Sequence, residues 1–184
     1  MTRMNKIKLA TVWLGGCSGC HMSFLDLDEW LIDLAAQVDV VYSPIADVKE
    51  YPEGVDIVLV EGAIANEEHL ELIHTIRQRT KTIISFGDCA VTGNVTAMRN
   101  LTGNANVSLQ LAYIEGADVN QQIPHEPGIV PPLLDHVVPV HYIVPVDIYL
   151  PGCPPSAARI RTAIEPLLKG ELPQMEGRAM IKFG

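Results

Sequence analysis

The four cysteines are the residues of this chain whose type and spacing could do chemistry. Cys17 and Cys20 form a Cys-x-x-Cys pair in the run LGGCSGC (residues 14–20), whereas Cys89 and Cys153 stand alone in the runs FGDCA (86–90) and LPGCPP (150–155). The thiolate of a cysteine is both a nucleophile and a metal ligand, so four cysteines indicate redox or metal chemistry if they come together.

Each of these three cysteine segments follows an apolar run that predicts a buried strand. The runs are residues 7–14, 82–86 and 146–150, and two further strands are expected at 38–42 and 55–60. Continuous apolar runs are typical of parallel strands that are covered on both faces. In an open parallel sheet, the loops after the carboxyl ends of the strands gather at one edge, where such folds bind ligands. We therefore expect the four thiols to converge and form a metal site.

Helical periodicity separates the predicted strands. Apolar residues recur at helical spacing over 22–37, 67–79 and 156–169. Asn66 is a good N-cap for the second of these helices, and Pro166 is expected to bend the last turn of the third. Shorter helical signals cover 91–103 and 106–113, the latter inside a Pro-rich excursion of 104–145. The alternation predicts an α/β fold, a flavodoxin-like doubly wound parallel sheet of five strands, with the excursion before the last strand.

Length and composition restrict the class of protein. The 184 residues suit a single domain over 1–184, with a core at about 7–169 and an extended tail at 170–184. The formal net charge of −9 argues against nucleic acid and anionic membrane surfaces as partners. No apolar run approaches the roughly 20 residues of a membrane span. The start, MTRMNK, has no twin arginine and no apolar signal region, so a cytoplasmic protein is expected.

Several kinds of site compete for this cysteine pattern. A thioredoxin-like dithiol would leave Cys89 and Cys153 incidental, although each follows a predicted strand as Cys17 does. A structural zinc site usually pairs two Cys-x-x-Cys knuckles, and a zinc ion would add little to a fold with a large core. Four thiolates are the usual ligands of a 4Fe–4S cluster. Glycines beside the cysteines let the backbone approach such a group closely, so the residues favour an iron–sulfur cluster.

The cysteine motifs, taken in order, resemble those of nickel–iron hydrogenase small subunits. The matching runs are WLGGCSGCHMS (13–23), VEGAI (60–64), GDCA (87–90) and PGCPP (151–155), and the similarity spans about 7–169. Within that family, the motifs resemble those of the small subunits of cytoplasmic, bidirectional NAD-reducing hydrogenases. The resemblance implies a flavodoxin-like domain with one 4Fe–4S cluster. The implied cluster ligands are Cys17, Cys20, Cys89 and Cys153.

The resemblance also implies a role and partners. This subunit would relay electrons, while hydrogen would be cleaved at a nickel–iron site on a separate large subunit. Diaphorase subunits with flavin and iron–sulfur clusters would pass the electrons to NAD⁺, so the subunit would belong to a hydrogen dehydrogenase. The chain has no Gly-x-Gly-x-x-Gly run that would indicate nicotinamide binding. It also shows no dedicated flavin signature, so FMN on this chain stays unassigned.

Two departures from the exported members of this family restrict what the resemblance implies. Those members carry a second, cysteine-rich domain and a twin-arginine leader, and this sequence shows neither. They also often have a Glu two residues after the second cysteine, where this chain has Met22, so a proton role cannot be transferred from that Glu.

Other interpretations stay open at this point. The complex I subunit with the same fold typically has adjacent cysteines in the first motif, unlike the spaced pair here. A zinc-stabilised binding module without a redox role and a flavodoxin-like flavin protein are further alternatives.

Three polar residues lie next to the implied ligands in the sequence. Glu61 is interpreted either as a carboxylate beside the cluster, acting as a proton relay or an occasional ligand, or as a loop carboxylate bonded to backbone amides. Asp88 is expected to cap the turn that follows it. His21 is interpreted as a solvated histidine, with a hydrogen bond at the subunit interface as the alternative. Met22 is expected in the core, with a position facing the large subunit as the alternative, while His125, His136 and His141 are expected at the surface or at an interface.

Overall fold

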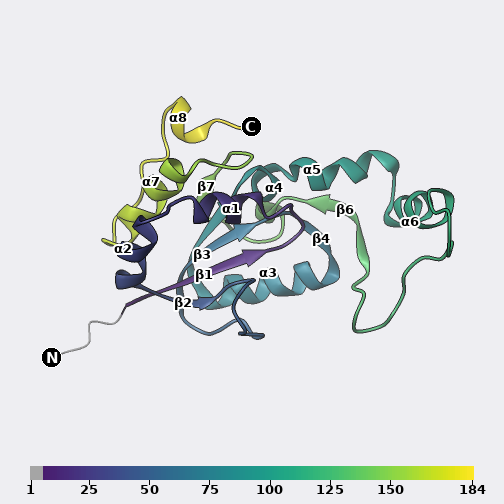
Figure 1. Cartoon of the computed structure of the whole chain (residues 1–184), viewed down its shortest axis with the longest axis horizontal. Coiled ribbons are helices and arrows are strands. Elements are labelled where there is room, and N and C mark those ends of the chain that lie inside the picture. The colour runs from purple at the N-terminus through teal and green to yellow at the C-terminus, as the bar shows by residue number, and fades with distance from the viewer. Residues whose placement is uncertain (1–5) are drawn as a thin grey trace.

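A computed structural model of the chain describes residues 6–184. Two predictions include residues 1–5: the single domain over 1–184 and the absence of an export signal at the start of the chain. Residues 1–5 lie outside the described residues. Five parallel strands form the central sheet in the order β2-β1-β3-β5-β7, the flavodoxin-like order, so the predicted fold class is confirmed (Figure 1). The strands are β1 (Ile7–Trp13), β2 (Val38–Tyr42), β3 (Val55–Glu61), β5 (Thr80–Phe86) and β7 (Ile148–Leu150).

The sheet is buried on both faces, as its continuous apolar strands require. In β3, Ile57 and Leu59 pack into one hydrophobic cluster, while Val58 and Val60 pack into the other. The first cluster includes residues of α2 (Trp30–Gln37) and α7 (Ala157–Leu167). The second includes residues of α3 (Glu67–Arg79), which begins where Asn66 accepts a hydrogen bond from the backbone N–H of His69. Helices on both faces therefore hold the carboxyl ends of the strands in place.

Two predicted helical segments are divided in the structure. Residues 22–37 form α1 (Gly19–Leu25) and α2, because the chain turns between them at Asp28, which has a φ of 49°. The short helical signal at 91–103 becomes α4 (Asp88–Thr92), α5 (Asn94–Ala97) and the 3-10 helix η1 (Met98–Thr102). Pro166 lies in the last turn of α7, which ends at Leu167.

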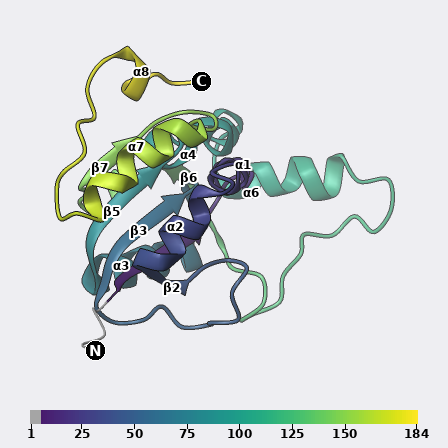
Figure 2. The same cartoon turned by 60° about the vertical axis from the view of Figure 1, so that its left-hand side comes forward.

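The Pro-rich excursion contains more structure than a loop. It holds α6 (Ala105–Gln110), the π-helical turn η2 (Leu111–Glu115), β6 (Leu133–Val138) and the 3-10 turn η3 (Val140–Tyr142). The sequence did not predict that β6 would pair antiparallel with β4 (Ile64–Asn66) in a second, two-stranded sheet. Figure 2 shows α6 and the loop after it projecting away from the central sheet.

The ends of the chain differ from the prediction in two further details. β7 begins at Ile148 and not at residue 146, and the tail predicted to be extended contains a short helix, α8 (Arg178–Ile181). No helix in residues 6–184 combines the length and the apolar character that crossing a bilayer demands.

The strands end level with one another at the carboxyl edge. Trp13 lies opposite Glu61, and Glu61 lies opposite Phe86. Phe86 in turn lies opposite Leu150. The loops after β1, β3, β5 and β7 therefore start from one line, and three of these loops carry the cysteines.

Candidate metal centre

The cysteines lie where the prediction put them, just beyond the carboxyl ends of three strands. Cys17 and Cys20 follow β1, with Cys20 in the first turn of α1. Cys89 lies in α4 directly after β5, and Cys153 lies in the loop after β7. Cys20 and Cys89 are buried, while Cys17 and Cys153 are exposed, and all four are free thiols.

Gly87 shows how closely the three loops approach. A Cβ added at Gly87 would lie 2.2 Å from the Sγ of Cys20 and 3.4 Å from the carbonyl oxygen of Gly152. Gly87 also has φ 84° and ψ 164°, a backbone conformation that is essentially restricted to glycine. The β5 loop therefore passes between the first cysteine pair and the loop of Cys153 only because residue 87 has no side chain.

Burial and the surrounding charges both act on the two buried thiols. Burial raises the pKa of the Cys20 thiol, and the charges of Glu61 and of the three other cysteines raise it further. Burial likewise raises the pKa of Cys89, although hydrogen bonds with Thr96 and the Val95 backbone lower it in part. A cationic metal centre favours thiolates and would reverse these shifts. The donor set thus suits an iron–sulfur cluster, in which thiolates bind iron.

Two polar side chains near the thiols were missed by the sequence analysis. The amide Nδ2 of Asn94 donates to the Sγ of Cys153 at 3.5 Å, and Thr96 donates to the carbonyl of Gly15 at 2.7 Å. Both residues lie on α5, which the turn at Gly93, with a φ of 87°, directs back toward the cysteine loops. A glycine just past a helical segment is a helix stop signal, so Gly93 could have indicated this reversal.

Glu61 ties the first cysteine loop to the end of β3. It is 1% exposed, and its carboxylate accepts hydrogen bonds from the backbone N–H groups of Cys20 at 3.4 Å and His21 at 2.9 Å. The carboxylate also pairs with Nδ1 of His21. Of the two interpretations of Glu61, the contacts fit the loop carboxylate, and the prediction of a solvated His21 is wrong because this pairing holds the ring.

Asp88 does not cap the turn that follows it. It lies inside α4, whose N-cap is Gly87, and its Oδ1 accepts a hydrogen bond from the backbone N–H of Gly152 at 2.6 Å. The predicted role is therefore wrong, because the carboxylate reaches across to the neighbouring loop and not along its own helix.

The remaining predicted side chains lie at the surface. Met22 is 57% exposed, so its prediction as core is wrong, and Trp13 beside it is 47% exposed. His125, His136 and His141 are exposed, as expected. Among residues 6–184, no group of three or more His, Cys, Asp or Glu side chains that could hold a metal ion is found.

Comparisons with known proteins agree with the resemblance in the motifs. Residues 17–167 match the family described as "NADH ubiquinone oxidoreductase, 20 Kd subunit". The chain is 40% identical over 170 residues to a subunit of the F420-non-reducing hydrogenase vhu of Methanocaldococcus jannaschii, covering 92% of this chain and 58% of that protein. It is 38% identical over 172 residues to the NAD-reducing hydrogenase HoxS subunit delta of Cupriavidus necator, covering 91% of this chain and 81% of that protein.

Solved structures extend the similarity to three dimensions. A chain of an NAD⁺-reducing [NiFe]-hydrogenase in the H2-reduced state has a TM-score of 0.90 and 37% identity, covering 98% of this chain and 100% of that chain. A [NiFeSe]-hydrogenase chain of Dm. baculatum, with a TM-score of 0.59 and 16% identity, shares the fold alone. This chain spans little more than half the length of the methanogen relative. The chain belongs to the family that the NADH ubiquinone oxidoreductase 20 kDa subunit shares with the small subunits of nickel–iron hydrogenases.

Proposed function

We propose that this chain is the electron-relay small subunit of a cytoplasmic, NAD-reducing nickel–iron hydrogenase. It holds one 4Fe–4S cluster through Cys17, Cys20, Cys89 and Cys153. The partners are a large subunit with the nickel–iron site and diaphorase subunits that carry flavin and iron–sulfur clusters. One observation carries the proposal: thiols from three separated loops gather at one sheet edge in a chain that is 37% identical to a chain of an NAD⁺-reducing hydrogenase.

The residues of this chain have distinct tasks in the proposed site. The bound cluster would supply one-electron transfer, and the four cysteines would hold it. Asn94 would donate to the sulfur of Cys153, a kind of contact that tunes cluster potentials. Cys20 and Cys89 are buried, while Cys17 and Cys153 are exposed to solvent. Electrons would therefore enter or leave the site on the side of Cys17 and Cys153.

The exposed apolar side chains near Cys17 indicate where the large subunit would dock. Trp13, Met22 and Leu25 are each about half exposed and line a cavity of 390 Å³ together with the Ser43–Ile45 segment. A contiguous exposed apolar patch often marks an interaction site, because a partner that covers it removes apolar surface from water. Covering this side would also bring a partner's metal site next to the exposed thiol of Cys17.

A proton role for Glu61 is a separate part of the proposal. The buried carboxylate touches His21 and the backbone beside Cys20, so a proton could pass between Glu61 and the Nδ1 of His21. Glu61→Gln keeps an oxygen acceptor for the backbone N–H groups but cannot exchange a proton. For a proton relay, hydrogen-dependent activity should fall by about 10²-fold at unchanged iron content. Unchanged activity would leave Glu61 with a structural task only.

Metal analysis of the anaerobically purified complex tests the cluster. We expect iron and acid-labile sulfide on this chain, together with an EPR signal from the reduced protein. Zinc without sulfide would overturn the proposal in favour of a zinc-stabilised binding module, and flavin released on denaturation of this chain would add FMN to it.

The electron acceptor needs its own measurement, because the methanogen relative with 40% identity is named as a subunit of an F420-non-reducing hydrogenase. That similarity favours, as a second candidate, a hydrogenase subunit that passes electrons to an acceptor other than NAD⁺. Hydrogen-dependent NAD⁺ reduction by the purified complex would support the first candidate. Hydrogen-dependent dye reduction without NAD⁺ reduction would support the second.

A further inference from the structure

Asp88 is a buried carboxylate between two cysteine loops, and the proposed cluster ligation gives it no task. Its side chain lies at the carboxyl edge with only 6% of the residue exposed. Oδ1 accepts from the N–H of Gly152 at 2.6 Å, while the N–H of Asp88 donates to the carbonyl of Gly152 at 2.9 Å. Oδ2 accepts from the N–H of Gly184 at 2.9 Å. Both oxygens are thus bonded to backbone donors that are distant in the sequence.

Two hydrogen bonds in opposite directions join the residues that directly precede two of the cysteines. Asp88 comes directly before Cys89, and Gly152 comes directly before Cys153. A pair of bonds in opposite directions fixes both the separation and the relative rotation of two segments, which a single bond does not. The contact therefore determines how the Cys153 loop sits against the Cys89 loop.

The Cys153 loop has few other ways to be held. Its sequence, PGCPP, contains three prolines, which have no N–H, so Gly152 and Cys153 supply the only backbone donors of the loop. Gly152 has a φ of 139°, and a Cβ there would lie 2.5 Å from Pro155, so this position also excludes a side chain. One of the two donors in the loop is thus committed to Asp88. On the other side of the loop, Ser23 donates to the carbonyl of Pro155 at 2.7 Å.

Arg159 on α7 is a cationic group that interacts with the charge of Asp88. Burial lowers the pKa of Arg159, and the negative charge of the Asp88 carboxylate opposes that shift. Arg159 also donates to the carbonyl of Met180 in α8. The carboxylate and the guanidinium thus hold the tail segment that ends in the Gly184 contact.

We propose that Asp88 is a positioning residue that locks the Cys153 loop to the Cys89 loop, so that the two isolated cysteines present their sulfurs at a fixed spacing. The lock itself follows from the contacts, and its consequence for the cluster rests on the proposed function. Because Oδ1 acts as a hydrogen-bond acceptor, an amide at this position would preserve the lock and an alanine would not.

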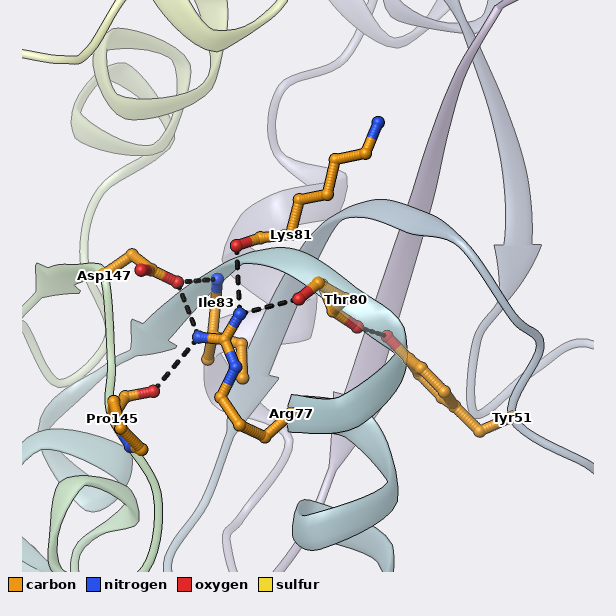
Figure 3. Close-up of polar contacts among 7 residues, drawn as sticks. All are labelled: Tyr51, Arg77, Thr80, Lys81, Ile83, Pro145 and Asp147. Carbon is orange, nitrogen blue, oxygen red and sulfur yellow. Dashed lines mark hydrogen bonds and ion pairs between the residues drawn. The ribbon is translucent and has the colours of Figure 1, made fainter.

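Asp147 provides a matched control at the other end of the same strand pair. Its Oδ2 accepts from the backbone N–H of Ile83 at 2.8 Å and from Arg77 at 2.8 Å (Figure 3). It too is a carboxylate that joins the β5 segment to the β7 segment, but it contacts no cysteine loop. Asp147→Ala therefore shows the effect of losing hydrogen bonds between the β5 and β7 segments on the stability of the fold, without disturbing the proposed ligands.

The experiment compares Asp88→Ala, Asp88→Asn and Asp147→Ala in the anaerobically purified complex. Hydrogen exchange at the Gly152 amide reads the lock directly and does not depend on iron. We expect exchange at least about 10-fold faster in Asp88→Ala, near wild-type exchange in Asp88→Asn, and no change in Asp147→Ala. Unchanged exchange in Asp88→Ala would overturn the proposal.

Iron release to a chelator and the EPR spectrum of the reduced protein give the second readout. Loss of a residue that orients metal ligands typically costs about 10–100-fold in metal affinity, so Asp88→Ala should release iron faster by that order and show an altered spectrum. Asp88→Asn should restore both, and Asp147→Ala should match wild type in both. Equal release from all variants would overturn the positioning role.

Two further outcomes keep the test decisive. If Asp88→Ala fails to accumulate, Asp88→Glu keeps the charge and displaces the oxygens by one methylene group. Faster Gly152 exchange is then expected, and wild-type behaviour would overturn the lock. If the wild-type complex holds no iron, the proposed function fails, while Gly152 exchange still decides whether Asp88 locks the loops.

Discussion

The two edges of the central sheet are held together by different chemistry. At the amino edge, oppositely charged side chains pair between neighbouring segments, as Arg77 of α3 does with Asp147 at 2.8 Å (Figure 3). Lys81 of β5 likewise pairs with Asp56 of β3 at 2.7 Å. At the carboxyl edge, Glu61 and Asp88 are buried and bond to backbone N–H groups. The loops there contain no Lys or Arg in residues 14–29, 62–66, 87–98 and 151–158.

This difference is consistent with the proposal that the carboxyl edge holds the metal centre. At the amino edge, Lys and Arg side chains already neutralise the carboxylates, so no metal cation is required there. The carboxyl edge places four thiols beside two carboxylates, and ionising those thiols costs free energy because like charges repel and burial opposes charge. A cationic iron centre would supply positive charge beside the thiols. Variants at the two edges test this contrast.

Replacing an isolated cysteine should have the largest effect. Cys89→Ser or Cys153→Ser removes one of four proposed iron ligands, and we expect hydrogen-dependent NAD⁺ reduction to be lost. NADH-driven dye reduction by the proposed diaphorase subunits should remain, since electrons in that assay do not pass through this chain. The two assays on the purified complex check this prediction, and hydrogen uptake with NAD⁺ that survived either change would show the ligand assignment to be wrong.

Adding one methyl group at Gly87 should damage the site nearly as much. In Gly87→Ala the new Cβ would lie 2.2 Å from the Cys20 Sγ, so the sulfur or the loop must move. We expect iron release to a chelator to be faster by about 10–100-fold. Gly54→Ala is the control at the amino edge, since Gly54 also has a positive φ, 67°, but its nearest atom is Lys8 Nζ at 3.9 Å.

The two variants separate backbone strain from displacement of the sulfur. Both place alanine in a conformation that costs about 1–3 kcal/mol, so both should lower the midpoint of denaturation. Only Gly87→Ala should accelerate iron release. Equal iron release from both would mean that the close approach to Cys20 has no bearing on the proposed cluster.

Much of this site could be predicted from the sequence, because it depends on where strands end. The apolar runs before Cys17, Cys89 and Cys153 fixed the three strand ends, and parallel topology then predicted the convergence. The partners of Asp88 and His21 could not be predicted in this way. Each contacts a residue on another loop, and local patterns, which favoured a cap for Asp88 and solvent for His21, carry no information about such contacts.

The excursion was harder to predict for the same reason. The pairing of β6 with β4 joins residues 64–66 to residues 133–138, and neither segment has the length or the alternation of a typical strand. The break between α1 and α2 depends on the positive φ of Asp28, which helical periodicity does not reveal. The sequence therefore predicts the sheet and its edge well, and the connections that refine them poorly.

Glu61 should show an intermediate effect, because it satisfies backbone donors in the interior. Glu61→Ala leaves the N–H groups of Cys20 and His21 without their acceptor, and an unsatisfied buried donor costs about 1–3 kcal/mol. We expect the free energy of unfolding to fall by that order in chemical denaturation. Glu61→Gln should lose less, because its side-chain oxygen can still accept from these groups. Equal losses in the two variants would show that the charge of Glu61, and not its hydrogen bonding, stabilises the loop.

The smallest effect is expected at the amino edge, where exposed charges pair. Burial raises the pKa of Asp56, but hydrogen bonds from Lys81 and from the Lys8 backbone outweigh it, so the pKa lies below its usual value. A lowered carboxyl pKa stabilises the fold above the pKa of the unfolded chain, about 3.9, and this contribution is lost as pH falls through the folded value. Lys81 is largely exposed, so water screens the pair to at most about 1 kcal/mol.

Asp56→Asn should therefore lower stability slightly at pH 7, and the difference from wild type should shrink below about pH 4. Denaturant titrations at both pH values measure this, and a difference that persisted at low pH would mean that Asp56 acts through packing and not through its charge.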